Sequence, residues 1–371
     1  MRIAIAAALV ALATVTQARL VSVTRSIELS GALTRINTAY TFDQEQGYAI
    51  TVPGTTEGYI AVTTGSAKRE ILFERIPSAD SITYVVPPVT SFTFQQVVTH
   101  QNLPDPAYQS QIEDIKLRYT LDLTANLSPA DLTGLDTYTV RVRCPSPRIL
   151  DIQAPDSFSY THTKGSPSVV FTPKTISRDT KNAIASIAYV NNDPVASFKS
   201  YKRTVELSTY ASNVNYHDAI TLYNCGPKLK GQFARIEHQK AMFSRRPTSA
   251  LNALSMALPP TAYDPYYYDA VGNVSTSRFS PDPKKKRNAL IEFQPRYPLL
   301  GGWQYAFEMG WNSPLSEWEK KEGTKRVLRV DPFTPTRDLA IDELEVNVRL
   351  PEGAMCVAVF VTRSHTNNST V

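Results

Sequence analysis

A six-residue motif that occurs twice constrains the fold of this 371-residue chain more than any other feature. Residues 25–30 read RSIELS and residues 203–208 read RTVELS, so the copies lie 178 positions apart (203 minus 25). Each copy opens a segment in which apolar and polar residues alternate, as in a strand with one buried face. Because this period divides the chain beyond residue 18 almost evenly, we expect two similar domains, residues 19–202 and residues 203–371.

Most other segments also predict strands. The chain has 26 Pro but only 15 Gly, which suits strands joined by rigid turns. Residues 250–258 fit either a helix or a strand. Many short strands with frequent turns predict a mainly β protein with two tandem β-sandwich-like domains. The segments with alternating or β-branched residues between Pro, Asn and Asp clusters are 112–123, 138–142, 169–172, 183–190, 290–293, 303–311, 326–330 and 344–350.

Residues 1–18 predict a signal peptide. Met1-Arg2 supplies a positive charge, residues 3–15 are apolar or small, and residues 16–18 (TQA) place small side chains where a signal peptidase reads. We expect cleavage between Ala18 and Arg19 and entry into the secretory pathway. No later run reaches the roughly 18 to 20 apolar residues of a membrane span. The longest, residues 355–361, predicts one buried strand.

The charge pattern does not indicate a nucleic-acid partner. Lys and Arg total 39 and Asp and Glu total 34, a net charge of +5 spread over the whole length. The one basic run, KKKR at residues 284–287, follows Pro281-Asp282-Pro283 and predicts a solvated loop. A docking role towards an acidic partner or lipid phosphates is the alternative for this run.

We find no pattern that predicts a catalytic, metal or cofactor-binding residue. The five His residues are isolated, and the chain lacks H-E-x-x-H, G-x-S-x-G, P-loop and G-x-G-x-x-G motifs. His217-Asp218 is an acid/base couple without a nucleophile near it in the sequence. Glu343 and Glu345 have strand spacing and are interpreted as solvated residues of one face. Catalysis, a metal and a cofactor are therefore not expected.

The three cysteines, Cys144, Cys225 and Cys356, are too few for a disulfide scaffold and have no C-x-x-C spacing. They allow at most one intrachain bridge, and the sequence does not say which pair would form it.

Aromatic residues cluster in the second half, and on strands they predict sandwich core. A partner interface and a sugar-binding platform are the alternatives. The cluster comprises Tyr266, Tyr267, Tyr268, Phe293, Tyr297, Trp303, Tyr305, Trp311 and Trp318.

Several stretches together carry a family resemblance. They are residues 203–208, 229–237 (LKGQFARIE), 266–277 (YYYDAVGNVSTS), 290–314 (LIEFQPRYPLLGGWQYAFEMGWNSP) and 350–354 (LPEGA). The chain closely resembles the ribophorin I family, subunit 1 of the endoplasmic-reticulum oligosaccharyltransferase. Residues 25–30, 97–106 (VVTHQNLPDP) and 171–175 (FTPKT) follow the family order less tightly. The most specific stretch, PRYPLLGGW, supplies the signature residues Pro295, Arg296, Pro298, Gly301, Gly302 and Trp303.

The resemblance implies a non-catalytic role. The family's complex transfers a preassembled oligosaccharide from dolichyl diphosphate to Asn in Asn-x-Ser/Thr sequons, and a different, multi-spanning subunit carries catalysis and the metal. Members contribute two lumenal β-sandwich-like domains that hold the complex together and help present substrate. The expected partners are the other subunits, including the catalytic one, and nascent polypeptides, but not nucleic acid.

The resemblance also implies a continuation beyond residue 354. Family members proceed into further lumenal sequence, a transmembrane helix and a cytosolic segment, as single-pass type I proteins of the endoplasmic-reticulum membrane. This chain ends at Val371 without such a helix, so we expect an incomplete second domain. A truncated or spliced form and a soluble relative both stay open. The alternative function is a soluble lumenal or secreted β-sandwich module that binds glycans or nascent chains.

Asn273 is the favoured N-glycosylation acceptor. It opens the sequon Asn273-Val274-Ser275 and follows Gly272, which predicts an exposed hairpin tip. Asn126 is weaker because Pro129 follows its sequon, and Asn368 is weaker because it lies close to the end of the chain.

Overall fold

The computed structural model describes most of the chain beyond residue 18. Its described residues are 19–53, 59–65, 68–111, 113–127, 131, 135–174, 183–244, 248, 250–284, 286–323, 325–336, 339–354 and 358. The expected signal peptide with Ala18, together with Cys356 and Asn368, lies outside them. Among the described residues, the helices with assigned bounds are α2 (Arg235–Phe243) and the 3-10 turn η2 (Leu315–Glu317), and the other secondary-structure elements are strands. This confirms the mainly β prediction.

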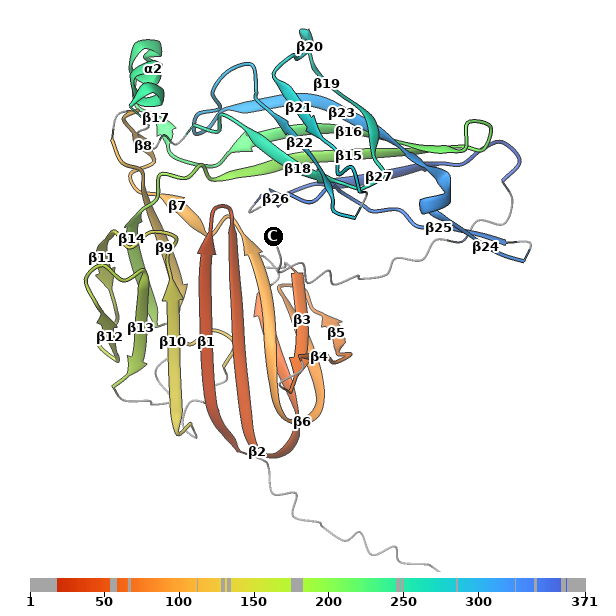
Figure 1. The fold of residues 1–371 in the computed structure, drawn as a ribbon. Coiled ribbons are helices and arrows are strands. Elements are labelled where there is room, and N and C mark those ends of the chain that lie inside the picture. The colour runs from red at the N-terminus through yellow and green to blue at the C-terminus, as the bar shows by residue number, and fades with distance from the viewer. Residues whose placement is uncertain are drawn as a thin grey trace, which may run out of the picture.

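The first half contains two sheets that share one core (Figure 1). The larger has nine strands, in the order β12-β13-β10-β1-β2-β6-β3-β4 with β5 also paired to β6. The smaller has the order β11-β14-β9-β7. Buried residues of both, such as Val140 of the first and Ile187 of the second, belong to a single apolar cluster. The strands are β1 (Leu20–Ser30), β2 (Leu33–Pro53), β3 (Tyr59–Thr64), β4 (Arg69–Glu70), β5 (Glu74–Pro77), β6 (Ser81–Thr99), β7 (Asn102–Pro104), β9 (Lys116–Asp122), β10 (Thr137–Arg143), β11 (Ile149–Gln153), β12 (Phe158–His162), β13 (Ser168–Pro173) and β14 (Ile184–Val190).

The second half repeats this arrangement with its own core. A seven-stranded sheet has the order β20-β19-β23-β16-β15-β26, with β27 also paired to β15, and a three-stranded sheet has the order β18-β22-β21. Residues of both, such as Phe307 and Ile291, share the second apolar cluster. The strands are β15 (Ala196–Ser208), β16 (Asn213–Asn224), β18 (Leu254–Leu258), β19 (Tyr263–Asp269), β20 (Gly272–Asn273), β21 (Ser277–Ser280), β22 (Ala289–Phe293), β23 (Gln304–Pro314), β26 (Ala340–Ile341) and β27 (Leu344–Arg349), and a separate hairpin consists of β24 (Glu319–Glu322) and β25 (Lys325–Leu328).

The two copies of the repeated motif occupy equivalent places in the two large sheets. β1 pairs with β2 in antiparallel register and with β10 in parallel register, and β15 pairs in the same ways with β16 and β27. The third strand of each set, β6 or β23, follows on the far side of the hairpin. The copies are therefore structural counterparts. In each sheet the parallel neighbour of the motif strand, β10 or β27, lies far from that strand in the sequence.

The boundary between the halves stays a proposal. Buried residues up to Val195 pack in the first core, and those from Ala196 onwards pack in the second, with Ala340 as an exception. β15 runs without a break through residues 202 and 203. We propose that the division expected at 202/203 lies instead at the start of β15.

The strand predictions agree with the observed elements. The eight predicted segments correspond to β9, β10, β13, β14, β22, β23, β25 and β27, and the ambiguous residues 250–258 contain β18. One further pairing joins the halves: β8 (Tyr108–Gln109) runs parallel to β17 (Lys228–Leu229), next to α2 (Figure 1). In the part of the chain that the structure describes, no helix has the length and apolar character of a membrane span.

Candidate functional site

The acid/base pair noted in the sequence does not form one unit, because His217 and Asp218 lie on opposite faces of β16. His217 Nδ1 is 2.8 Å from the Tyr266 hydroxyl, and its Nε2 is 3.0 Å from Glu308 Oε2 on the outer face. Asp218 is fully buried on the inner face. Among the described residues, no group of three or more His, Cys, Asp or Glu side chains could hold a metal ion.

Arg203 and Asp218 form a buried ion pair directly across the β15–β16 hairpin. Arg203 Nε donates to Oδ1 at 2.7 Å and Nη2 donates to Oδ2 at 2.6 Å, a bidentate arrangement. Tyr201 donates to the same carboxylate at 2.6 Å, and Arg203 Nη1 donates to the carbonyl oxygen of Asp331 at 2.7 Å. Burial lowers the pKa of Arg203, but Asp218 outweighs that effect and holds the pKa above its usual value.

Two aromatic rings cover the guanidinium. Tyr216 and Trp311 stack with centroids 5.1 Å apart and ring planes 4° apart. Arg203 Cζ lies 5.2 Å from the Tyr216 centroid and 5.0 Å from the Trp311 centroid, which is cation–π geometry. The charge, the carboxylate and both rings thus fix one another's positions.

These rings carry two polar atoms without a partner. Tyr216 and Trp311 are each 1% exposed, yet neither the Tyr216 hydroxyl nor Trp311 Nε1 has a hydrogen-bond partner. A buried donor left unsatisfied costs about 1–3 kcal/mol, and native proteins keep few of them. By contrast, Trp318 Nε1 donates to Ser313 Oγ at 2.8 Å.

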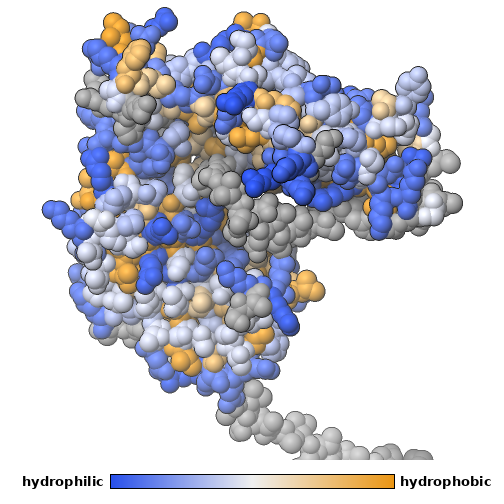
Figure 2. Space-filling model, viewed as in Figure 1, coloured by the Kyte–Doolittle hydropathy of each residue, from blue (hydrophilic) through white to orange (hydrophobic). Residues whose placement is uncertain are grey.

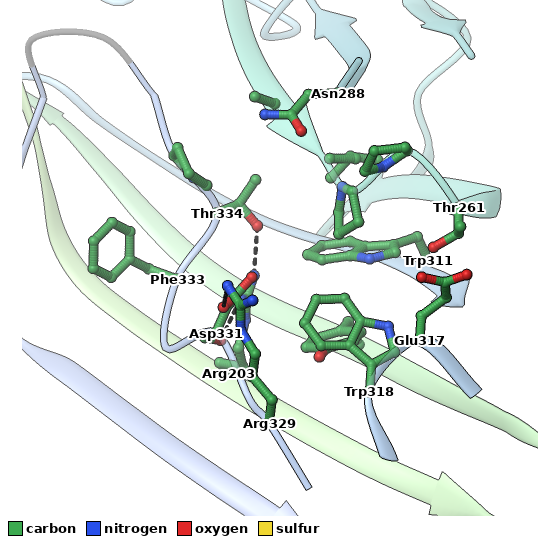
Figure 3. Close-up of a pocket in the computed structure, with 16 residues that line it drawn as sticks. Arg203, Thr261, Asn288, Trp311, Glu317, Trp318, Arg329, Asp331, Phe333 and Thr334 are labelled. Atoms are coloured by element: carbon green, nitrogen blue, oxygen red, sulfur yellow. Dashed lines mark hydrogen bonds and ion pairs between the residues drawn. The ribbon is translucent and has the colours of Figure 1, made fainter. Parts of the chain in front are cut away.

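The residues Tyr216 and Trp311 are among those that line a pocket of about 390 Å³, although their two unpartnered polar atoms are themselves buried (Figure 3). Glu317 lies beside the Trp311 and Trp318 rings, and a hydrogen bond joins Arg203 to Thr334 (Figure 3). The other lining residues come from the end of β18 and the loop after it, from Asn288 before β22, and from the segment that follows β25. They are Ala257, Leu258, Pro259, Pro260, Thr261, Arg329, Asp331, Phe333 and Pro335.

The aromatic cluster is core in large part, as the sequence predicts. Tyr267, Phe293, Tyr305 and Trp311 are at most 3% exposed. Tyr268 and Tyr297, at 36% and 41%, face outwards. The pocket could not be predicted from the sequence, because the loops that complete it carry no periodic pattern.

The signature stretch packs the second half together. Arg296 binds both carboxylate oxygens of Asp269, at 2.6 and 2.8 Å, and Tyr305 donates to Asp269 Oδ2 at 3.0 Å. The hydrogen bonds from Arg296 hold the pKa of Asp269 below its usual range. Pro295 is buried, whereas Pro298 and Trp303 are half-buried.

Gly301 and Gly302 let the same stretch turn against the loop before β17. A Cβ on Gly301 would lie 2.0 Å from the carbonyl oxygen of Pro227, and Gly302 has φ +81°. A side chain at Gly301 would therefore collide with backbone, and one at Gly302 would be strained.

A polar seam joins the two halves. His100 Nε2 lies 2.7 Å from Asp342 Oδ1, and Ser197 donates to Asp342 Oδ2 at 3.1 Å. The Ser197 hydroxyl is also 3.4 Å from Cys225 Sγ. Hydrogen bonding to Cys225 and to Asp342 raises the pKa of His100 to about 9, against the opposing effect of burial.

Two of the three cysteines lie in the described residues, and both are free thiols. Cys144 is buried in the first core, and burial raises its pKa to about 12, which makes it unreactive. Cys225 is half-buried at the seam.

The helix α2 exposes apolar side chains. None of its residues is buried, and Ile236, Met242 and Phe243 are 67%, 53% and 90% exposed. Apolar colour appears among polar residues on this corner of the surface, at the upper left (Figure 2). Gln111 of the first half anchors the start of the helix through two hydrogen bonds with Ala234.

The basic run lies exposed between β21 and β22, as expected. Asp282 accepts hydrogen bonds from the backbone N–H groups of Lys284, Lys286 and Arg287, so the run is a turn closed on that carboxylate. Lys285 is outside the described residues.

Two of the sequon asparagines, Asn273 and Asn126, lie in the described residues, and they differ in exposure. Asn273 is exposed in β20, in the hairpin with β19. Asn126 is half-buried with φ 68°, and its carbonyl oxygen accepts a hydrogen bond from Tyr40.

Comparison with known proteins points to one family. The model of the family described as ribophorin I matches residues 18–370. A rice (Oryza sativa subsp. japonica) dolichyl-diphosphooligosaccharide–protein glycosyltransferase subunit 1B is 31% identical over 72% of this chain and 54% of its own length. The Arabidopsis thaliana subunit 1A is 30% identical over 70% of this chain and 40% of its own length. The Caenorhabditis elegans subunit 1 is 33% identical over 47% of this chain and 29% of its own length.

This chain thus spans about half or less of the length of the curated relatives it matches. A solved M1 zinc metallopeptidase from Deinococcus radiodurans aligns over 62% of this chain and 52% of its own, at 12% identity and a TM-score of 0.25, which is too low to carry an argument.

Proposed function

This chain belongs to the ribophorin I family, and we propose from that premise that it is a non-catalytic structural subunit of the oligosaccharyltransferase complex. The observation that carries the proposal is the family match over residues 18–370, together with relatives named as subunit 1 of that glycosyltransferase. In this role both halves face the lumen of the endoplasmic reticulum. The complex attaches oligosaccharide from dolichyl diphosphate to Asn-x-Ser/Thr sequons, and another, multi-spanning subunit performs the chemistry.

The use of the signature residues supports a structural role. Arg296 is held by Asp269, and Gly301 has no room for a side chain beside Pro227. These residues fix the loop between β22 and β23 against the rest of the half. We expect signature residues that fix a loop in this way in a subunit that presents rigid surfaces to its neighbours.

We further propose α2 as a surface that contacts another subunit of the complex. An apolar side chain that is 90% exposed, as Phe243 is, gains stability only when something covers it. The helix is nevertheless anchored by Gln111, so it presents its apolar residues from a fixed position. Burial of exposed Ile, Met and Phe at a subunit interface provides a favourable contact.

Co-purification tests both proposals. The tagged product of the full-length gene is expected to recover the multi-spanning catalytic subunit from detergent-solubilised microsomes. Failure to recover that subunit, with the tagged protein folded and correctly located, would reject the assignment and favour the soluble binding module. Ile236→Ser combined with Phe243→Ser is expected to lower the recovery severalfold. The matched control is Leu72→Ser, which alters a residue that is 95% exposed elsewhere in the first half. Undiminished recovery with the double variant would reject α2 as the contact and leave the family role intact.

A further inference from the structure

A groove on the outer face of the large second-half sheet is lined by aromatic rings. It lies near the start of β15, the end of β16 and the start of β23, which are neighbours in the sheet (Figure 1). Its volume is about 640 Å³, within the usual range for binding sites. Half of its lining comes from the signature stretch 295–303, beyond the residues that fix the loop. The lining residues are Lys199, Tyr223, Tyr297, Gly302, Trp303 and Gln304.

Trp303 is held in place and has a free indole N–H. Its ring packs edge-on against Phe233 and Tyr297, with ring centroids 5.9 Å and 6.1 Å away. The Tyr297 hydroxyl donates to the carbonyl oxygen of Gln304 at 2.8 Å, which fixes the second of these rings. Trp303 Nε1 has no hydrogen-bond partner among the described residues, and unlike Trp311 Nε1 it is not buried from solvent. A ligand can therefore accept a hydrogen bond from it.

The charge and the polar groups of the groove favour a ligand that accepts hydrogen bonds. Lys199 is exposed and lies at a bulge in β15, where the pairing with β16 shifts between Phe198 and Ser200. None of the six described lining residues is acidic. The side chains of Lys199 and Trp303 can donate hydrogen bonds but cannot accept them. A suitable ligand therefore offers acceptors to the groove and a negative charge to Lys199.

The backbone beneath the groove offers nothing to the N–H groups of a ligand. Tyr223 pairs with Ser197 on one side and with Gln304 on the other, so the ladder uses the backbone groups there. An ordinary peptide laid on this face would bury N–H groups without acceptors, which is unfavourable. Proline has no N–H, and a polyproline II helix leaves its carbonyl oxygens free to accept. Grooves lined by aromatic rings are a recurring way of binding such helices.

We propose that this groove binds a proline-rich segment of another protein in the polyproline II conformation. Trp303 Nε1 donates to a backbone carbonyl oxygen of the segment, and Lys199 lies next to an acidic residue at one end of it. A saccharide is less suitable, because its hydroxyl hydrogens need acceptors and no carboxylate is among the described lining residues. The inference does not depend on membership of the oligosaccharyltransferase complex, so the two proposals fail independently.

The test uses the whole chain secreted from eukaryotic cells. The probe is a capped peptide of about nine residues, or three turns of polyproline II helix, in which Glu precedes Pro-Pro-Leu repeats. A Gly-Ser peptide of the same length with the same Glu is its control. Acrylamide quenching of tryptophan fluorescence reports mainly on the groove, because Trp303 is half-buried whereas Trp311 and Trp318 are 1% and 8% exposed. We expect the proline-rich peptide to bind saturably and to reduce quenching, and the Gly-Ser peptide to do neither.

Lys199→Glu is the decisive variant, because it alters an exposed charge and leaves the core unchanged. It is expected to weaken binding of the Glu peptide about threefold, and to strengthen binding of the same peptide with Lys in place of Glu to a similar extent. Lys164→Glu, which makes the same charge change at an exposed position of the first half, should alter neither affinity. Trp303→Phe keeps a ring but removes the N–H, and should raise Kd about fivefold in isothermal titration calorimetry.

Four results would overturn the proposal. The first is the absence of saturable binding by the proline-rich peptide at about 1 mM. The second is equal affinity for the proline-rich and Gly-Ser peptides. The third is an unchanged preference between the Glu and Lys peptides in Lys199→Glu, or an unchanged Kd in folded Trp303→Phe. The fourth is displacement of the peptide by N,N′-diacetylchitobiose, which would assign the groove to a saccharide.

Discussion

The β1–β2 hairpin of the first half and the β15–β16 hairpin of the second half hold a buried arginine in two different ways. Arg25 lies opposite Thr38 in its hairpin, whereas Arg203 lies opposite Asp218. Arg25 Nη1 donates to the carbonyl oxygen of Asp122 at 2.9 Å, and its Nε has no partner. No salt bridge joins Arg25 to a carboxylate among the described residues, whereas Arg203 binds both oxygens of Asp218.

The groups around the two arginines also differ. Arg25 lies near the buried phenols of Tyr40, Tyr119 and Tyr138. Burial raises the pKa of each phenol and the charge of Arg25 opposes the rise, so that the pKa of Tyr138 is about 12. The repeated motif thus places an arginine inside each half, and the residue across the hairpin decides how that charge is neutralised. The arginine of the second half also borders a pocket.

Exchanging the residues across the two hairpins should have the largest effect. Asp218→Thr leaves Arg203 buried without its carboxylate and is expected to lower the free energy of unfolding by about 3–5 kcal/mol. Thr38→Asp gives Arg25 a partner and is expected to raise it by about 1 kcal/mol. Urea unfolding followed by tryptophan fluorescence reports on the second half, because Trp303, Trp311 and Trp318 all lie there. Hydrogen exchange at the backbone amides of β1 and β2 follows the first half, because tyrosines lie in both halves. A larger loss from Thr38→Asp than from Asp218→Thr would contradict the comparison.

Removing the two arginines should have unequal effects. Arg25→Met loses the hydrogen bonds to the Asp122 carbonyl oxygen and to the Tyr138 side chain, together with an unpartnered Nε, so the free energy of unfolding is expected to fall by about 1–2 kcal/mol. Arg203→Met leaves the carboxylate of Asp218 buried and unpaired and should cost about 3–5 kcal/mol. Equal losses in the two variants would show that Arg25 has a strong partner after all.

The inward direction of these arginines could have been recognised from the sequence. In β1, Val23, Arg25 and Ile27 alternate with exposed residues, and all three are buried. The same period of two in β16 turns Asp218 inwards and His217 outwards. The alternation that predicted the strands therefore also contained the ion pair, although no sequence prediction placed Arg203 and Asp218 together.

Other features could not be predicted from one sequence. The parallel pairing of β1 with β10 and of β15 with β27 joins segments far apart in the chain, and periodicity carries no information about such partners. The pocket depends on irregular loops whose conformation follows from the packing of the strands that they connect. The seam needs His100 and Asp342, which come together only after both halves have folded.

The contact between the halves should weaken as the pH rises. The pKa of His100 is raised from 6.5 to about 9, so its stabilising contribution is complete below about pH 6.5 and is lost as the pH rises through 9. His100→Gln is therefore expected to be less stable than the wild type at pH 6 and nearly equal to it at pH 10. Asp342→Asn should show the same convergence, because it removes the other member of the pair. Cys225 also forms a hydrogen bond with His100, so Cys225→Ser is measured in parallel. A constant difference in unfolding free energy between pH 6 and 10 would rule out the charged pair.

The smallest effect on stability is expected where the halves differ in their sequons. We propose that Asn273 of the second half carries an N-linked glycan and that Asn126 of the first half does not. Asn273 is exposed and pairs with Tyr268 in a hairpin, so a glycan would extend into solvent without disturbing the core. Asn126 is half-buried in a left-handed turn, and its carbonyl oxygen accepts a hydrogen bond from Tyr40.

Protein from a eukaryotic secretory system should therefore lose mass on endoglycosidase treatment. Asn273→Gln is expected to abolish that mass shift and to leave the melting temperature within about 1 °C, because an exposed substitution away from the core has little effect on stability. Asn126→Gln, the matched control, should keep the full shift. Peptide mapping that finds Asn273 unmodified in protein that has passed through the lumen would refute the assignment. A shift that disappears only with Asn126→Gln would mean that the half-buried turn opens before the enzyme acts, and would reverse the difference between the halves.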